Sequence, residues 1–591
     1  MRISSSPAAA IHFDRERWPE EATALESLSV PDLLCVGLDL AQPARGLGEI
    51  VNARRRGTLV AALIVHRDPL EILLLQILGL VRATADPDTR ALQLAALRDR
   101  RLNLQGKSPE EMASPAIELV NAAKFALRLA DFVLVATPAD RFRLERLTGT
   151  TLRRWTLLPD AEPLAQPTRD RDVTVYAPSV KRAELAGVEM ALELRGVGAQ
   201  LITAENARDA IRGATVVLPE LWRGRRACAL AAAGYRVAVP EECGAELLYH
   251  GIATYNIRDP HTIGDALDIL AAMSSPAPKL RVEPAHVASI ALAERPPALD
   301  GPLLSLVIRT ADRPEFLRRA LASVAQQGYR NIEIVLVNNG SQEVLELAQA
   351  AGGGFPIAYV RPPAPVKLAA ALNLGMQAAT GTYIGYLDDD DIFYPDHCAR
   401  SVALLEQTGA DLSYSKCVGE YSRVDENGVK HVLGMQVYTD WPYRLDDLYS
   451  SNLTTIHSVV HRRELFDRFG FTDESLAVTE DWELWLRMAS GGARFVHLDR
   501  PTCEYSWRDD KRNPNTSTER RAEFALAYET ILERYHSHVA NRTGTILPRQ
   551  QGNLAHIRSH AQAVAADPAA GLRLNMQDVM MHAAPVEGLV E

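Results

Sequence analysis

Residues 382–391 have the sequence TYIGYLDDDD, in which an apolar, β-rich run passes directly into four aspartates, and residues 392–395 (IFYP) are again apolar. Adjacent carboxylates at a strand end repel one another, so a structural role without partners is unfavourable. A divalent cation would relieve the repulsion, because Mg²⁺ prefers hard oxygen ligands and commonly takes one or two carboxylates together with phosphate oxygens. A solvated acidic turn is the plainer alternative. The pattern predicts a metal site at the end of a strand.

Two more strands are predicted upstream of this loop. Residues 304–310 (LSLVIRT) are followed by ADRP and a helical pattern, and residues 332–337 (IEIVLV) are followed by NNGS. Loops that follow parallel strands lie at the carboxyl edge of a sheet, where ligands of open α/β folds bind. The amides of Asn338 and Asn339 could contact a nucleobase edge, although an ordinary turn explains the same residues.

Residues 479–487 (TEDWELWLR) predict a helix with Thr479 as its N-cap and acidic residues in its first turn. Hydrogen-bond donors at the start of this helix are expected to favour the ionised form of Asp481. Such a carboxylate could accept a proton from a hydroxyl group as a general base. The alternative is a well-capped amphipathic helix with no chemical role.

Taken together, residues 303–517 resemble family 2 glycosyltransferases, which have the nucleotide-sugar-binding GT-A fold. The matching stretches occur in the family's order: SLVIRTADR, IVLVNNGS, LAAALNLGMQAATGTYIGYLDDDD and HSVVHRRELFDRFGFTDESLAVTEDWELWLRMA. The resemblance implies an inverting hexosyltransferase that uses Mg²⁺ or Mn²⁺. Its donor would be a UDP-, GDP- or dTDP-sugar, and its acceptor a hydroxyl of a glycan or lipid-linked molecule in bacterial polysaccharide assembly.

The same resemblance assigns residues to the donor. Thr310, Asp312, Asn338 and Asn339 would border the base and ribose, and Asn373 would lie near the donor pocket.

The acidic loop would hold the metal. Asp388 and Asp390 would form the DxD pair, with Asp390 as the first choice for direct metal ligation and Asp391 as a further member of the metal site. Asp388 and Asp389 would also contact the donor, as would Glu480.

The resemblance also implies the mechanism. Asp481, in the family's Glu-Asp motif, would deprotonate the acceptor hydroxyl, which attacks the anomeric carbon from the side opposite the nucleotide. Residues 471–474 would shape the acceptor side.

Three stretches depart from the family pattern. Asn338 and Asn339 stand where acidic residues are common, and residues 311–312 (AD) stand where Tyr-Asn is frequent. Residues 505–510 (YSWRDD) contain no histidine, although the family often supplies one close to the metal.

The whole chain is expected to be an α/β protein of several domains. Two Rossmann-like domains, 1–160 and 161–275, resemble the two halves of GT-B glycosyltransferases, through stretches such as ADFVLVATPADRFRLERLTG and LAAAGYRVAVPEECGAELLYHGIATYNIRDPHTIGDALDIL. A proline-rich linker, 276–302, is expected to be extended or irregular. The GT-A domain, 303–517, and a helical extension with a tail, 518–591, follow.

Three functional alternatives follow from this organisation. The GT-B-like half lacks a clean copy of that family's acidic pair, which favours a noncatalytic module beside one active site. A bifunctional transferase is the second reading, and a glycan-binding scaffold with a relic acidic loop is the third.

Composition restricts the partners and the compartment. A net charge of −11 and a pI of about 5.8 give no general attraction to nucleic acid. The six cysteines are scattered without a CxxC pair, which favours a reducing compartment. No apolar run reaches membrane-spanning length, and the N-terminal residues lack the core of a signal peptide. A cytoplasmic location is predicted, and peripheral association with the inner face of the membrane stays open.

Overall fold

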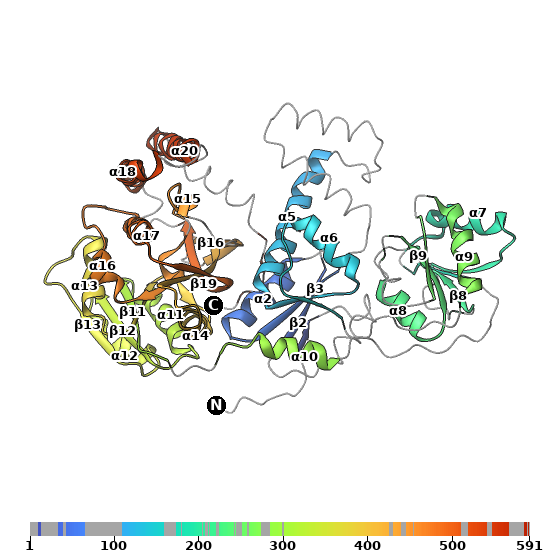
Figure 1. Cartoon of the computed structure of the whole chain (residues 1–591), viewed down its shortest axis with the longest axis horizontal. Coiled ribbons are helices and arrows are strands. Elements are labelled where there is room, and N and C mark those ends of the chain that lie inside the picture. The colour runs from blue at the N-terminus through green and yellow to red at the C-terminus, as the bar shows by residue number, and fades with distance from the viewer. Residues whose placement is uncertain are drawn as a thin grey trace. The chain divides into compact units, whose positions relative to one another are not determined.

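The computed structural model describes residues 10–12, 33–39, 43–65, 109–158, most of 173–273, 284–297, 301–424, 430–438, 445–452, 454–509, 518–540, 546–566, and 584, 586, 587 and 589. The chain divides into two compact units, and Figure 1 labels their helices and strands. The first comprises Met1–Ile50 and Thr58–Arg295, and the second Val51–Gly57 and Pro296–Glu591. The division at Arg295 falls inside the segment 276–302 that the sequence predicted as a linker.

One sheet of the first unit consists of five parallel strands in chain order. The strands are β1 (Ala10–His12), β2 (Leu33–Asp39), β3 (Leu59–Val65), β4 (Phe132–Val135) and β5 (Trp155–Leu157). Three helices belong to this part of the chain: α2 (Pro43–Arg55), α5 (Pro109–Leu129) and α6 (Pro138–Thr148). The strands are almost continuously apolar because parallel sheets are usually covered on both faces.

The other sheet of this unit is also parallel and has the order β10-β9-β8-β6-β7. After β7 the chain returns to the other side of β6 and adds β8, β9 and β10 there. This change in the side on which strands are added is typical of a doubly wound fold. The strands are β6 (Val173–Tyr176), β7 (Ala199–Ile202), β8 (Thr215–Val217), β9 (Arg236–Pro240) and β10 (Ile252–Tyr255). The helical elements are η1 (Arg182–Leu185), α7 (Ala186–Leu194), α8 (Gly224–Ala232), η3 (Pro260–Thr262) and α9 (Ile263–Ala272).

One expectation about the linker is wrong. Within the segment expected to be extended or irregular, α10 (Pro284–Ala293) is a helix that buries Val287 and Ala291 against Leu33 and Cys35. The run AHVASIALA between two proline-rich stretches is long enough for a helix, and a proline is well tolerated at its first position. The nearby prolines therefore mark the limits of this helix.

The second unit is built on one mixed sheet of nine strands in the order β13-β12-β11-β14-β18-β16-β19-β15, with β17 paired to β16. The first four strands are parallel, and β18 then runs antiparallel to β14. The strands are β11 (Leu304–Thr310), β12 (Ile332–Asn338), β13 (Ile357–Val360), β14 (Tyr383–Asp388), β15 (Ile392–Phe393), β16 (Leu412–Val424), β17 (Lys430–Tyr438), β18 (Val459–Arg462) and β19 (Phe495–Asp509). The three strands predicted from sequence are confirmed.

Two apolar cores lie in the second unit. Leu306 and Ile308 of β11 belong to one core, whereas Val307 belongs to the other, because successive side chains of a strand point to opposite faces. The helical elements of this region are α11 (Pro314–Ala325), α12 (Leu345–Ala351), α13 (Leu368–Ala378), α14 (His397–Thr408), α15 (Leu445–Leu448), η4 (Ile456–Ser458), α16 (Leu465–Phe469) and α17 (Glu480–Ser490). Both faces of the central strands are therefore filled with apolar side chains.

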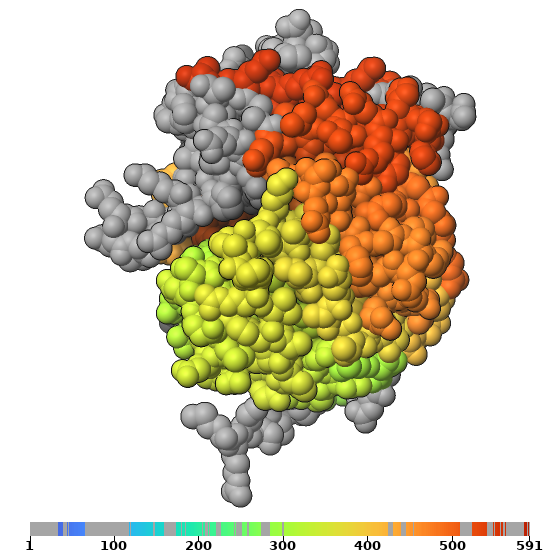
Figure 2. All heavy atoms as spheres, turned by 90° about the vertical axis from the view of Figure 1, so that its left-hand side faces the viewer, coloured from blue at the N-terminus to red at the C-terminus, as the bar shows by residue number. Residues whose placement is uncertain are grey.

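The helices at the C-terminal end belong to the same unit. They are α18 (Thr518–Arg534), α19 (His536–Ala540) and α20 (Ile546–Ala566). Ile531 and Tyr535 share a core with Trp482 and Trp485 of α17, and Figure 2 shows these helices (red) on the surface beside residues 450–500 (orange). The last of these helices, α20, is 21 residues long. Among the described residues, no helix is both long and apolar enough to cross a membrane.

Candidate active site at the carboxyl ends of the strands

Three parallel strands bring polar side chains to one edge of the sheet. In the register of β11 with its two neighbours, Thr310 pairs with Asn338 and Arg309 pairs with Asp388. Residues that are distant in sequence therefore begin their loops side by side.

The four aspartates after β14 differ in their exposure. The side chains of Asp388 and Asp390 are 33% and 19% exposed, whereas Asp389 and Asp391 are buried. The turn is closed by a hydrogen bond from Asp391 N to Asp388 O at 3.1 Å. The first and third carboxylates are thus the ones open to solvent, which is the spacing of a DxD pair.

Arg309 joins the acidic loop to α17. Its Nη2 and Nε donate to Asp388 Oδ1 at 2.7 and 3.2 Å, and its Nη1 donates to Glu480 Oε1 at 3.0 Å. Burial by itself raises the pKa of Asp388, but the charge and hydrogen bonds of Arg309 outweigh it, so the pKa lies below its ordinary value. Glu480 pairs with this buried guanidinium, and its contact with the donor stays a prediction.

Asp389 ties the loop to the end of β11. It accepts a hydrogen bond from Thr310 Oγ1 at 2.7 Å and is paired with Arg313 through both of its oxygens. Burial raises the pKa of Asp389 to about 7, and Arg313 opposes this rise. Thr310 and Asp389, both predicted to contact the donor, therefore hold each other.

Asp390 has two arginine partners. Arg313 Nη1 and Arg508 Nη2 donate to its Oδ2 at 3.1 and 2.9 Å, and the Arg508 guanidinium lies 3.9 Å from the centre of the Phe316 ring. Residues 505–510, which contain no histidine, thus supply Arg508 as a partner of Asp390, while Asp510 lies outside the described residues. Of the two arginines, only Arg313 could have been suspected from the sequence, because it lies in the ADR motif directly after the first strand.

The four aspartates have protein partners that the sequence analysis did not identify: Arg309, Arg313, Arg508 and His457. Yet among the described residues no hydrogen bond engages Asp388 Oδ2 or Asp390 Oδ1. Each exposed carboxylate therefore keeps one oxygen for another partner. This donor set fits a hard divalent cation.

Asp391 has both oxygens engaged. His457 Nδ1 lies 2.9 Å from its Oδ2, and Ser506 N donates to its Oδ1 at 2.8 Å. Burial raises the pKa of Asp391 to about 6, although the neighbouring His457 lowers it. This arrangement holds the acidic loop against η4 and β19.

Asp481 lies at the start of α17. It accepts hydrogen bonds from Trp482 N at 2.8 Å and from Asn452 Nδ2 at 3.2 and 3.3 Å. Burial, with the nearby charge of Glu480, raises the pKa of Asp481 to about 7. The hydrogen bonds from Trp482 N and Asn452 favour the ionised form of Asp481, as expected for donors at the helix start, but the loss of solvent outweighs them.

The predicted side-chain cap of α17 is absent. Thr479 occupies the N-cap position but has φ of 60°, in the left-handed region, and its hydroxyl donates to Val478 O at 2.6 Å. The hydroxyl is therefore turned away from the helix. Such a backbone conformation is uncommon for a β-branched residue and is often found near functional sites.

Asp312 fastens the loop after β11 to the loop after β12. Its Oδ1 accepts hydrogen bonds from Ser341 N at 2.8 Å, Ser341 Oγ at 2.9 Å and Gln342 N at 2.9 Å. The bonds from Gln342 N and from Ser341 lower the pKa of Asp312. Gly340 allows this approach, because a Cβ there would lie 2.5 Å from Asp312 N.

The two asparagines after β12 act within the same loops. Asn338 Nδ2 donates to Gln342 O at 2.7 Å and to Tyr359 Oη at 2.8 Å, while Asn339 exchanges two hydrogen bonds of 2.9 Å with the main chain of Val366. Their amides therefore organise the loops, and contact with a nucleobase stays a prediction.

Asn373 lies on α13 and is buried. Its Nδ2 donates to Thr472 O at 3.0 Å and to Glu474 Oε1 at 2.9 Å, and its Oδ1 accepts from Thr472 N at 3.0 Å. It fixes the segment expected to shape the acceptor side.

Comparison with known proteins identifies this site as part of a glycosyltransferase. Residues 305–468 of the second unit match the family model for glycosyl transferase family 2, as the resemblance predicted. Asp481 lies beyond the matched residues.

Curated relatives of this chain are also named glycosyltransferases. An uncharacterised glycosyltransferase of Rickettsia typhi is 28% identical over 240 residues, covering 40% of this chain and 73% of the relative. One from Rickettsia prowazekii is 30% identical over 193 residues, covering 32% of this chain and 58% of the relative. The structure of S. aureus TarS 1–349 in complex with UDP-GlcNAc has a TM-score of 0.30 and 14% identity, covering 47% of this chain and 89% of that chain.

Proposed function

We propose that the second unit transfers a sugar from a nucleotide-sugar donor to a hydroxyl of a glycan or lipid-linked acceptor, with inversion at the anomeric carbon and with a divalent metal. Bacterial polysaccharide assembly is the proposed setting. One observation carries the proposal: Arg309, within the residues that match family 2, bonds both to the partly exposed Asp388 of the acidic loop and to Glu480, which lies beyond the match and next to Asp481. Donor and acceptor chemistry would thus share one connected site.

Asp388 and Asp390 are the residues proposed to hold Mg²⁺ or Mn²⁺, because each has one carboxylate oxygen without a hydrogen bond among the described residues. The ion would supply neutralisation of charge on the departing diphosphate. Asp391 is proposed to position the loop, since both of its oxygens are engaged. Arg313 and Arg508 add positive charge at the same place.

Asp481 is proposed as the general base. A base works best when its pKa lies near the working pH, and burial beside Glu480 raises the pKa of Asp481 to about 7. Asn452 donates to both oxygens of Asp481 and would hold the carboxylate in a fixed orientation. The proton of the acceptor hydroxyl would pass to this carboxylate as the oxygen attacks.

The test is a donor screen with the full chain. UDP-, GDP- and dTDP-sugars are added with Mg²⁺, Mn²⁺ or a chelator, and thermal stabilisation and nucleotide release are measured. We expect one nucleotide class to stabilise the protein only with metal, and Asp390→Asn to abolish that effect. Asp467→Asn, at an exposed position on α16, is the matched control. Metal-independent stabilisation, or an unchanged Asp390→Asn variant, would contradict the metal assignment.

A further inference from the structure

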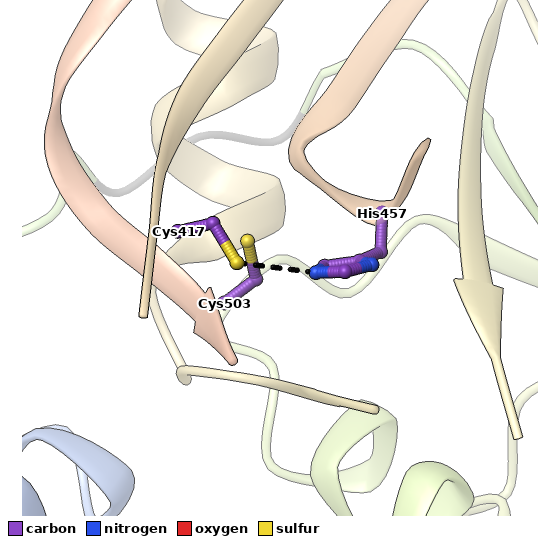
Figure 3. A group of neighbouring side chains, drawn as sticks. All are labelled: Cys417, His457 and Cys503. Carbon is purple, nitrogen blue, oxygen red and sulfur yellow. Dashed lines mark hydrogen bonds between the residues drawn. The ribbon is translucent and has the colours of Figure 1, made fainter. Parts of the chain in front are cut away.

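Two cysteines and a histidine lie close together next to the acidic loop of the second unit. Cys417 lies on β16, Cys503 on β19 and His457 in η4, and all three residues are buried. The two cysteines are direct partners in the parallel pairing of β16 with β19. One potential ligand atom from each of the three residues lies within 4.8 Å of the others (Figure 3). The side chains thus converge although they are far apart in sequence.

The imidazole is oriented toward the sulfur atoms. His457 Nε2 lies 3.2 Å from Cys417 Sγ, as Figure 3 shows, while His457 Nδ1 lies 2.9 Å from Asp391 Oδ2. A carboxylate on one ring nitrogen fixes the tautomer and leaves the other nitrogen to act as a ligand, and this arrangement is common behind metal-bound histidines. Asp391 would be the carboxylate that fixes the tautomer of His457.

We propose that Cys417, Cys503 and His457 form a buried site for Zn²⁺. Two thiolates and a neutral imidazole are ligands that Zn²⁺ prefers in tetrahedral sites, and two thiolates balance its charge. The fourth coordination position of the ion would be filled by a water molecule or by a nearby main-chain carbonyl, such as Val418 O, which lies 3.7 Å from Cys417 Sγ. This soft-ligand site is distinct from the carboxylates of the acidic loop, which suit Mg²⁺ or Mn²⁺.

Such an ion would connect three elements. It would link β16 to β19 and, through His457 and Asp391, to the acidic loop. Its expected role is structural, because all three ligands are buried and metal binding adds to the free energy of folding. The proposal does not depend on which sugar the enzyme transfers.

The first experiment uses the untagged full chain without substitutions. We expect about one equivalent of zinc by elemental mass spectrometry after desalting. Replacement by Co²⁺ should give thiolate-to-cobalt charge-transfer bands in the near ultraviolet and visible bands typical of tetrahedral cobalt. Absence of both zinc and these bands would overturn the proposal, whether or not the protein transfers sugar.

Variants then locate the ion. Cys417→Ser and Cys503→Ser should each lose the bound zinc and the charge-transfer bands, and Cys398→Ser is the matched control because Cys398 is equally buried in the same core. Circular dichroism checks that each variant is folded. Zinc that persists in the folded Cys417→Ser and Cys503→Ser variants but is lost in Asp390→Asn would belong to the acidic loop and would also overturn the proposal.

Discussion

Parallel strands end differently in the two units. In the first unit, Asn206 after β7 closes a local turn, accepting a hydrogen bond from Thr203 N at 2.7 Å. In the second unit, Arg309 near the end of β11 bonds to Asp388 and Glu480, which lie 79 and 171 residues further along the chain. Both units contain parallel strands, but only in the second, among the strand ends compared above, are distant charges joined in a buried network. The shared architecture therefore does not predict shared chemistry.

The arginines of the two units show the same contrast in energetic terms. Arg309 is buried between two carboxylates, whereas Arg195 of the first unit pairs with Asp265 and Asp268 on the surface. Removing one partner of a buried ion pair leaves an uncompensated charge, while exposed pairs contribute little. Substitution of each arginine therefore tests whether the distinction between the units is real.

The largest effect is expected for Arg309→Met. The variant leaves Asp388 and Glu480 without their shared cation, so the free energy of unfolding of the second unit should fall by about 3–5 kcal/mol. Urea denaturation followed by tryptophan fluorescence measures the change, since Trp482 and Trp485 are buried in this unit. Sugar transfer should be lost as well.

Arg195→Met is the control for that measurement, because its pair is exposed in the first unit. Its unfolding curve should match that of the unsubstituted chain. Equal losses in the two variants would mean that the Arg309 network is no stronger than a surface pair.

The next effect is on the chemical step. Asp481→Asn keeps the shape of the side chain but removes the proton acceptor, so kcat should fall by roughly 10²–10⁴-fold while donor binding is retained. Steady-state kinetics and donor-induced thermal stabilisation separate the two quantities. Full transfer by a folded Asp481→Asn protein would exclude this residue as the base.

Much of this site could be predicted from local sequence, and the rest could not for physical reasons. The strands that end at Thr310, Asn338 and Asp388 are marked by β-rich apolar runs, because local composition governs strand formation. The bonds of Arg309 depend on tertiary packing, which leaves no spacing pattern in the chain. The raised pKa of Asp481 likewise depends on burial, which the helix-start pattern does not reveal.

A smaller effect concerns the pH dependence of transfer. Because the base must be deprotonated, kcat/KM should rise about tenfold per pH unit below about pH 7 and level off above it, following the pKa of Asp481. Glu480 raises that pKa by its charge, so Glu480→Gln should move the rise to lower pH. Glu343→Gln, at an exposed pair with Arg361, is the control and should leave the profile unchanged. An identical profile in Glu480→Gln would assign the titration to another group.

The smaller of the two effects on stability depends on pH and comes from the same substitution that removes activity. The pKa of Asp481 is about 7 in the folded protein and about 3.9 in an unfolded chain, so the folded state binds the proton more tightly. This contribution is fully present below about pH 4 and is lost as the pH rises through about 7. Asparagine cannot ionise, so the stability of Asp481→Asn relative to the unsubstituted chain should increase between pH 5 and pH 8, by about 2–3 kcal/mol for this difference in pKa. Thermal melts at the two pH values measure the difference. A relative stability of the variant that does not increase between these pH values would show that the carboxylate is held in its charged form by the fold, and Asp481 would then resemble the locally satisfied polar groups of the first unit.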